Sequence, residues 1–173
     1  MFSASLWLDK LLLNHRDTEK LLLVRDQLMD EITANKTTLC PSARAESVDG
    51  IVFGIISGTV TEPRVTYLKQ PLPISEELIA KASPMTPTEI FRMATPCADK
   101  ACLHFDGQDC RLAKQIAEKL PTVTEELPPC SIRRDCRWWN QEGKAACMRC
   151  PQVITDNYNP SELAIQVSKL AAG

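Results

Sequence analysis

Cysteine spacing is the feature that most constrains how this chain can fold. Seven of its eight cysteines lie between residues 97 and 150. The last four are packed most densely along the chain: Cys130, Cys136, Cys147 and Cys150. We expect a chain without an export signal to meet a thiol pool that keeps cysteines reduced, so this density favours metal or redox chemistry over disulfides. The sequence therefore predicts a metal centre in the C-terminal half.

The composition is that of an ordinary globular chain. It has 173 residues, of which 44% are hydrophobic and 24% charged, enough to bury a core. We predict an α+β fold. Residues 1–96 would form a small core with N-terminal helices and a β-hairpin, and residues 97–173 a cysteine-rich, mostly helical and loop metal-binding lobe ending in a C-terminal helix.

Hydropathy and charge bear on location and partners. Residues 1–13 are apolar, but they include Asp9 and Lys10 and lack a basic leader and a small-residue cleavage site, so we expect a helix and a cytoplasmic protein. No stretch approaches the roughly 20 apolar residues of a membrane span, so we expect no membrane insertion. The net charge of −2 disfavours nucleic-acid binding by the whole protein.

Periodicity predicts the elements of the N-terminal half. Apolar residues three and four apart over residues 17–36 predict an amphipathic helix. The unbroken apolar run 51–56 predicts a strand covered on both faces. It would pair as a hairpin with residues 65–68, a second strand whose extent Pro63 would limit.

Four helix starts follow from capping signals. Ser75 begins one helix, and the capping box Thr86-Pro87-Thr88-Glu89 begins another. We expect the second to carry Phe91 and Met93 inward. A third helix follows Cys110 and ends before Pro121, and a fourth opens within Asn159-Pro160-Ser161-Glu162.

The last four cysteines are separated by five, ten and two residues, and Pro151 follows the last. Four thiolates suffice for a metal centre, and the two-residue gap lets two of them converge. A proline after the last cysteine also occurs in bacterial ferredoxin motifs. Zinc sites more often use two close pairs, and here only one pair is close. The spacing therefore favours an iron–sulfur cluster, with zinc as the alternative.

The segment from Arg133 to Cys136, followed after ten residues by Cys147-Met148-Arg149-Cys150-Pro151, resembles the C-terminal iron–sulfur motif of FhuF-like ferric-siderophore reductases. The resemblance covers about twenty residues and implies a [2Fe–2S] cluster and reduction of a ferric complex. Where that family has two adjacent cysteines, this chain has Asp135-Cys136, and Cys130 would supply the fourth thiolate. A [4Fe–4S] cluster is an equal alternative.

A second set of potential ligands precedes the first. It comprises Cys97, Cys102, His104 and Cys110. Three cysteines and one histidine form a legitimate zinc site. Alternatively, Cys40 joins Cys97, Cys102 and Cys110 around a second iron–sulfur cluster, which would divide eight cysteines into two sets of four.

Basic and aromatic residues accompany the C-terminal cysteines. We expect five of them to form a docking face for a redox partner such as a ferredoxin: Arg133, Arg134, Arg137, Trp138 and Trp139. The functional hypothesis is a cytosolic iron–sulfur protein for electron transfer, redox sensing or ferric-complex reduction, and so a candidate oxidoreductase component. The alternative is a zinc-stapled module that binds protein or nucleic acid without enzymatic activity.

Overall fold

The computed structural model describes residues 20, 22–24, 37–59 and 62–169, and the chain divides into two compact units between Lys36 and Thr37. Lys20 and Leu22–Val24 are helical. The remainder of the two helices predicted over residues 1–13 and 17–36 lies outside the described residues. All eight cysteines belong to the second unit.

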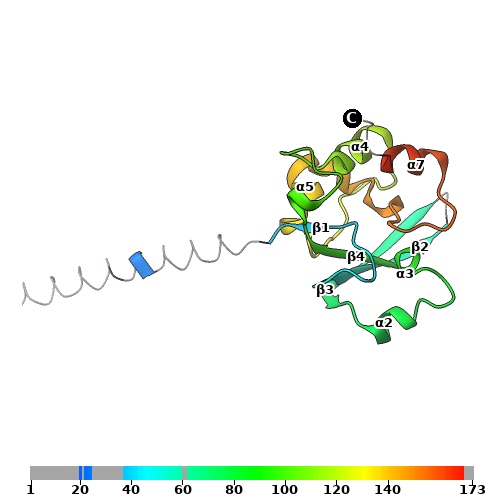
Figure 1. Cartoon of the computed structure of the whole chain (residues 1–173), viewed down its shortest axis with the longest axis horizontal. Coiled ribbons are helices and arrows are strands. Elements are labelled where there is room, and N and C mark those ends of the chain that lie inside the picture. The colour runs from blue at the N-terminus through cyan, green and yellow to red at the C-terminus, as the bar shows by residue number, and fades with distance from the viewer. Residues whose placement is uncertain (1–19, 21, 25–36, 60–61, 170–173) are drawn as a thin grey trace, which may run out of the picture. The chain divides into compact units, whose positions relative to one another are not determined.

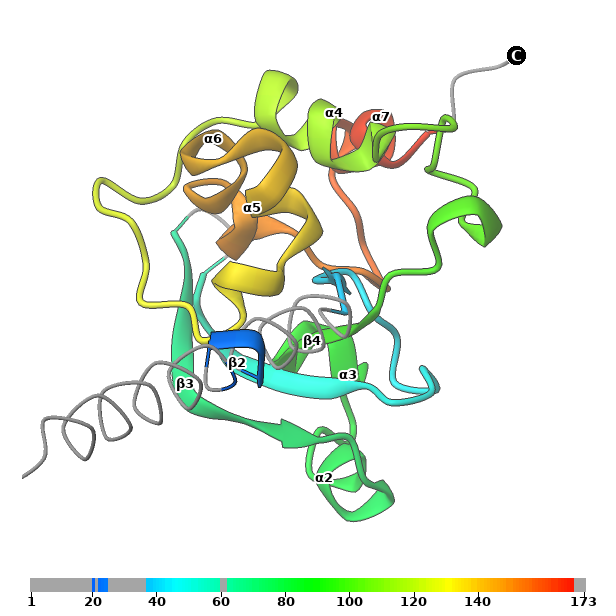
Figure 2. The ribbon, with the colours of Figure 1, turned by 90° about the vertical axis from the view of Figure 1, so that its left-hand side faces the viewer.

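The second unit contains a four-stranded antiparallel sheet with the strand order β1-β4-β2-β3. The strands are β1 (Leu39–Cys40), β2 (Ile51–Gly58), β3 (Pro63–Pro73) and β4 (Phe91–Pro96). Figures 1 and 2 show helices α4, α5 and α7 on one side of this sheet and helix α2 at the opposite end. Together, the helices and the sheet confirm the predicted α+β class.

The hairpin formed by β2 and β3 is confirmed, with Ile56 opposite Val65 in the register. Strand β3 is longer than expected because Pro63 begins it, opposite Gly58, and does not limit it. A proline is tolerated there because β3 is an edge strand and its first residue needs no ladder N–H. Gly58 has a φ of +84°, a conformation that glycine adopts without strain as the chain enters the turn.

Strand β4 replaces part of a predicted helix. The capping box is present, with the backbone N–H of Thr86 donating to Oε2 of Glu89 at 3.2 Å. Helix α3 (Pro87–Ile90) nevertheless ends after one turn, and Phe91 begins a strand that pairs with β2. The expectation that a helix carries Phe91 and Met93 inward was wrong. Both are buried, but cross-strand pairing overrides the local helical signal.

The other helix starts agree with the sequence. The hydroxyl of Ser75 accepts a hydrogen bond from the N–H of Leu78, and that of Ser161 accepts one from Ala164, each at 3.2 Å. The helices and 3₁₀ turns beyond α3 and the sheet have these bounds: α2 (Glu76–Ala80), η1 (Asp99–Ala101), α4 (Arg111–Lys119), η2 (Arg133–Asp135), α5 (Arg137–Glu142), α6 (Lys144–Cys147), η3 (Cys150–Gln152) and α7 (Glu162–Ser168).

Three hydrophobic clusters hold these elements together. One lies among the helices and centres on Ile116 and Trp138. A second packs β2 and β4 against α2 and α3. The third joins Phe53 and Ala94 of the sheet to Ile132, with Cys130 packed against them. The sheet and the cysteine-rich segment therefore share buried contacts. The division of the chain at residue 96 stays a prediction.

Candidate metal centre

Four cysteines at the ends of four short consecutive helices and turns line one small cavity, of about 20 Å³. We call Cys130, Cys136, Cys147 and Cys150 the first cysteine set. Cys130 precedes η2, Cys136 caps α5, Cys147 ends α6 and Cys150 begins η3. The structure thus brings together all four residues predicted as ligands of the C-terminal centre.

The backbone between α5 and α6 explains how these cysteines meet. Gly143 has a φ of +57° and separates the two short helices. This left-handed conformation costs glycine little and lets the chain reverse. Helix α6 and the turn after it then return Cys147 and Cys150 to the cavity that Cys136 lines.

The thiols of this set lie within electrostatic range of one another. Burial raises the pKa of Cys136 to about 12, with Cys150 and Cys147 adding to the rise. Burial likewise raises the pKa of Cys130 to about 11, and Cys150 adds to the rise there too. Such thiols stay protonated at neutral pH unless a cation compensates the buried negative charge, which metal coordination does.

Arg92 brings a buried positive charge to the set. Its side chain is 2% exposed, and its Nη2 donates to the carbonyl of Pro41 at 3.1 Å and to Sγ of Cys150 at 3.2 Å. Nη1 donates to the carbonyl of Val153. Within the described part of the chain, no carboxylate forms an ion pair with this guanidinium. A buried cation without an anionic partner is costly, so the site favours negative charge.

Further buried N–H donors around the cavity lack an acceptor. Arg133 and Trp138 both line it. Nε and Nη2 of Arg133, Nε1 of Trp138 and Nε of Arg92 have no hydrogen-bond partner among the described residues. A buried donor without a partner costs about 1–3 kcal/mol. An anionic, sulfur-rich group bound by the four thiols would supply acceptors for these donors.

Another part of the cavity wall comes from the sheet half of the protein. Phe53, Tyr67 and Pro41 line it, and burial raises the pKa of the Tyr67 hydroxyl, with Cys150 adding to the effect. These residues and Arg92 were missed by sequence reasoning. The one available signal was Arg92, a lone charge within the apolar segment Ile90-Phe91-Arg92-Met93-Ala94.

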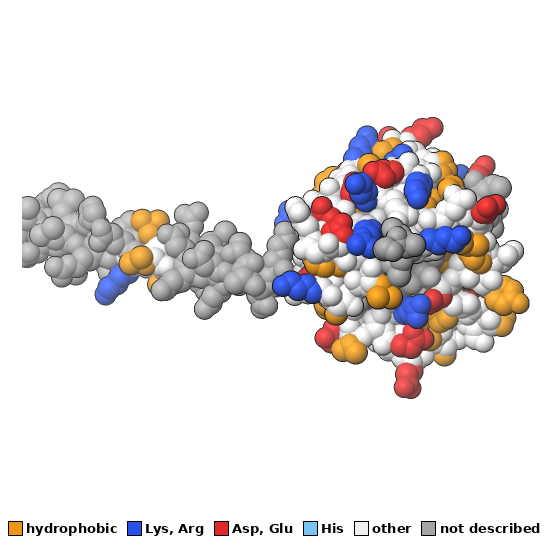
Figure 3. All heavy atoms as spheres, turned by 45° about the horizontal axis from the view of Figure 1, so that its top comes forward, with side chains coloured by type: hydrophobic (Ala, Val, Ile, Leu, Met, Phe, Trp, Pro, Cys, Tyr) orange, Lys and Arg blue, Asp and Glu red, His pale blue; other side chains and the backbone are white. Residues whose placement is uncertain are grey.

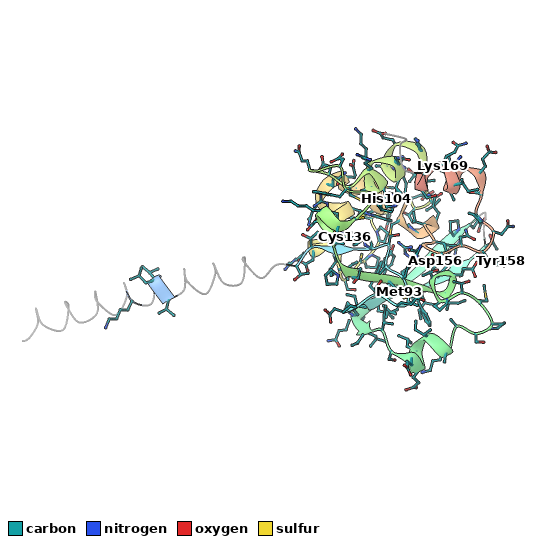
Figure 4. The ribbon with its side chains drawn as sticks, in the orientation of Figure 1. Met93, His104, Cys136, Asp156, Tyr158 and Lys169 are labelled. Atoms are coloured by element: carbon teal, nitrogen blue, oxygen red, sulfur yellow. The ribbon has the colours of Figure 1, made fainter. Side chains whose placement is uncertain are left out.

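A second group of cysteines gathers beside the first. Cys40, Cys102 and Cys110 line one cavity, of about 470 Å³, which His104 also lines. Burial raises the pKa of Cys40 to about 12, and Cys97, Cys110 and Cys102 add to the rise. We call Cys40, Cys97, Cys102 and Cys110 the second cysteine set. In Figure 4, His104 and Cys136 lie on the helical side of the sheet, which Met93 marks.

No three His, Cys, Asp or Glu side chains of the described residues meet the geometry of a single-ion site. In an iron–sulfur cluster, different thiolates bind different iron atoms, so the sulfurs need not converge on one point. All eight cysteines carry free thiols.

The predicted docking face is only partly available. Trp138 is 1% exposed and lines the cavity, so its assignment to a docking face is corrected. Arg133 stacks on the ring of Trp139 at 5.3 Å. Arg137 contacts Asp99 at 3.4 Å and donates to the carbonyl of Gln108 at 2.7 Å. Arg134 alone of the five is exposed.

Neither the surface charge nor similarity to known proteins points to a particular partner. Basic and acidic side chains are interspersed on the face shown in Figure 3. No helix among the described residues has the length and apolar character needed to cross a membrane. No protein-family model matches the sequence, and neither curated proteins nor solved structures give a significant match.

Proposed function

We propose that this chain is an iron–sulfur protein that carries single electrons. In this proposal, the thiolates of the first cysteine set ligate the cluster: Cys130, Cys136, Cys147 and Cys150. The observation that carries the proposal is the composition of one cavity wall. Four thiols and the buried, acceptor-less N–H groups of Arg133 and Trp138 belong to residues that line the same space.

The donors distinguish this site from a pocket of inert buried thiols. A free cysteine behaves as a small hydrophobic residue and needs no hydrogen-bond donor beside it. Here the neighbours include two guanidinium groups, and one of them donates to Sγ of Cys150. Thiolates that carry negative charge accept such hydrogen bonds far better than thiols do. The surroundings are therefore suited to four thiolates bound to a metal centre.

The same residues would set the reduction potential. Bound at this site, an iron–sulfur cluster supplies reversible one-electron oxidation and reduction. Arg92 and Arg133 place positive charge beside the thiolates, which favours the reduced, more negative state. Phe53 and Trp138 are each 1% exposed and keep water away, which disfavours added charge. The chain thus controls the potential with two opposing groups of side chains.

The partner and acceptor follow from the same chemistry. An electron would arrive from a reduced protein such as a ferredoxin and leave to an oxidised acceptor, with no bond made or broken in this chain. The spacing resemblance to FhuF-like reductases makes a ferric complex one candidate acceptor, reduced to the ferrous state by that electron. Exposed Arg134 is the remaining candidate for contact with an acidic partner.

Analysis of the anaerobically purified chain tests the proposal. We expect a brown protein that contains iron and acid-labile sulfide. Cys147→Ser and Cys150→Ser should each lower both contents, because each removes a thiolate ligand. Ser131→Ala is the matched control, since exposed Ser131 follows Cys130 directly. Iron and sulfide contents unchanged in both cysteine variants, or a colourless protein that binds zinc, would overturn the proposal.

A further inference from the structure

Strand pairing places Cys40 beside Cys97, although 57 positions separate them in the sequence. In the register of β1 and β4, Cys40 lies opposite Thr95 and Leu39 opposite Pro96. The N–H of Cys97 donates to the carbonyl of Thr38 at 2.7 Å, which extends this ladder by one pair. Side chains two positions apart share a face of a strand. Cys40 and Cys97 are therefore diagonal neighbours on one face. Residues in diagonal positions of such ladders are roughly 7–8 Å apart.

Two further cysteines follow Cys97 in the chain, one directly after turn η1 and one at the start of α4. The N–H of Cys102 donates to the carbonyl of Asp99 at 2.9 Å, which closes turn η1. Cys110 caps helix α4. Its backbone is held on both sides by Gln141, which accepts from the N–H of Cys110 at 2.7 Å and donates to its carbonyl at 3.0 Å. Cys102, Cys110 and Cys40 line one cavity.

Charged groups of both signs lie beside this set. Burial raises the pKa values of Cys97 and Cys110. The Asp99 carboxylate adds to the rise at Cys97, and the guanidinium of Arg137 opposes it at both cysteines. Arg137 is held in place by Asp99 and by the carbonyl of Gln108. Backbone N–H groups at the start of α4, those of Ala113 and Leu112, also favour a thiolate at Cys110.

The two cysteine sets are neighbours. Cys40 lines the second cavity and the next residue, Pro41, lines the first. Leu39, which precedes Cys40, forms a bridge with Cys136 of the first set. Cys136 is likewise followed by Arg137, which contacts Asp99, two residues after Cys97, at 3.4 Å. At two places, therefore, consecutive residues lie beside different cysteine sets: Cys40 and Pro41, and Cys136 and Arg137.

We propose that Cys40, Cys97, Cys102 and Cys110 hold a second iron–sulfur cluster beside the first, with Cys40 and not His104 as the fourth ligand. The ligand assignment stands on its own geometry, whereas the consequence for electron transfer rests on the proposed function. One electron leaves one cluster and arrives at the other, and no bond is made or broken. The partner of this chain would thus meet a two-centre electron carrier.

Four proteins purified anaerobically as the full chain test this inference: the wild type, Cys40→Ser, Cys147→Ser and His104→Ala. Cys40→Ser should lose about half of the iron and sulfide, and Cys147→Ser the other half. His104→Ala is the matched control and should keep both in full. After reduction, we expect the electron paramagnetic resonance spectrum of the wild type to be broadened by the neighbouring centre, and that of either cysteine variant to be simple.

Each failure is distinguishable. Wild-type iron content in Cys40→Ser, or loss of iron in His104→Ala, would overturn the assignment of Cys40. Loss of all iron in Cys147→Ser, with the circular dichroism of the wild type, would leave the proposed function standing and remove the second cluster. Zinc at the second set would also overturn the inference. Cys102→Ser repeats the iron measurement at another ligand if Cys40→Ser does not fold, and unchanged iron there would contradict the inference.

Discussion

Nη2 of Arg92 lies 3.2 Å from Sγ of Cys150 and donates a hydrogen bond to it. This contact joins strand β4 to the last cysteine of the chain, 58 positions later. The same nitrogen also holds the carbonyl of Pro41. A single buried guanidinium thus links the sheet to the wall of the first cavity. Substitutions in the sheet should therefore change the properties of the proposed cluster.

Two replacements of Arg92 should separate the effect of its charge from the effect of its packing. Arg92→Met removes the charge and should lower the midpoint potential by about 60 mV, which for one electron equals a difference of about 1.4 kcal/mol between the redox states. Arg92→Lys keeps the charge and should shift it less, although both variants lose hydrogen bonds and stability. Dye-mediated redox titration measures the potentials. Equal shifts in the two variants would contradict a role for the charge.

Trp138 should protect the first cavity. Trp138→Phe keeps an aromatic ring but shrinks a side chain that is 1% exposed. We expect a loss of about 1–3 kcal/mol in the free energy of unfolding and faster bleaching of the visible absorbance in air. Trp139→Phe, at the partly buried neighbouring position, is the control. Bleaching at the same rate in both variants would argue against this role of Trp138.

Thr88 should stabilise the segment that follows the cysteines. Its buried hydroxyl donates to the carbonyl of Asp156 at 2.8 Å and accepts from the N–H of Asp156 at 3.1 Å. Thr88→Val keeps the shape but leaves these backbone groups unpaired, at a cost of about 1–3 kcal/mol. Thermal unfolding followed by circular dichroism should show a lower midpoint. Thr122→Val, at an exposed position, should leave the midpoint unchanged, and an equal drop there would refute the explanation.

Gln141 should act as a positioning residue for Cys110. Gln141→Met removes both hydrogen bonds to the Cys110 backbone, each worth about 0.5–1.5 kcal/mol. We expect a lower iron content from loss at the second cysteine set, while the electron paramagnetic resonance signal of the first set persists. Asn140→Ala tests an exposed position one residue earlier. Full iron content in Gln141→Met would show that Cys110 needs no such support.

Local signals predicted several elements correctly. The helix that begins at Ser75, the helix after Cys110 and the one that opens within residues 159–162 follow from side chains that hydrogen-bond or pack within one or two turns. The hairpin also follows from neighbouring segments. Strand β4 was missed because its hydrogen-bond partners lie on β2, about 40 positions away, while the capping box beside it signals a helix.

The sequence by itself determined the chemistry available to this protein: eight cysteines, a close pair before Pro151 and arginines among them. Tertiary structure decided how those thiols are grouped and what surrounds them. Antiparallel pairing of β1 with β4 brings Cys40 to Cys97, and burial places Arg92 against Cys150. The physical reason is range: spacing reports contacts along a few turns of chain, whereas these contacts form only once the strands pair and water is excluded.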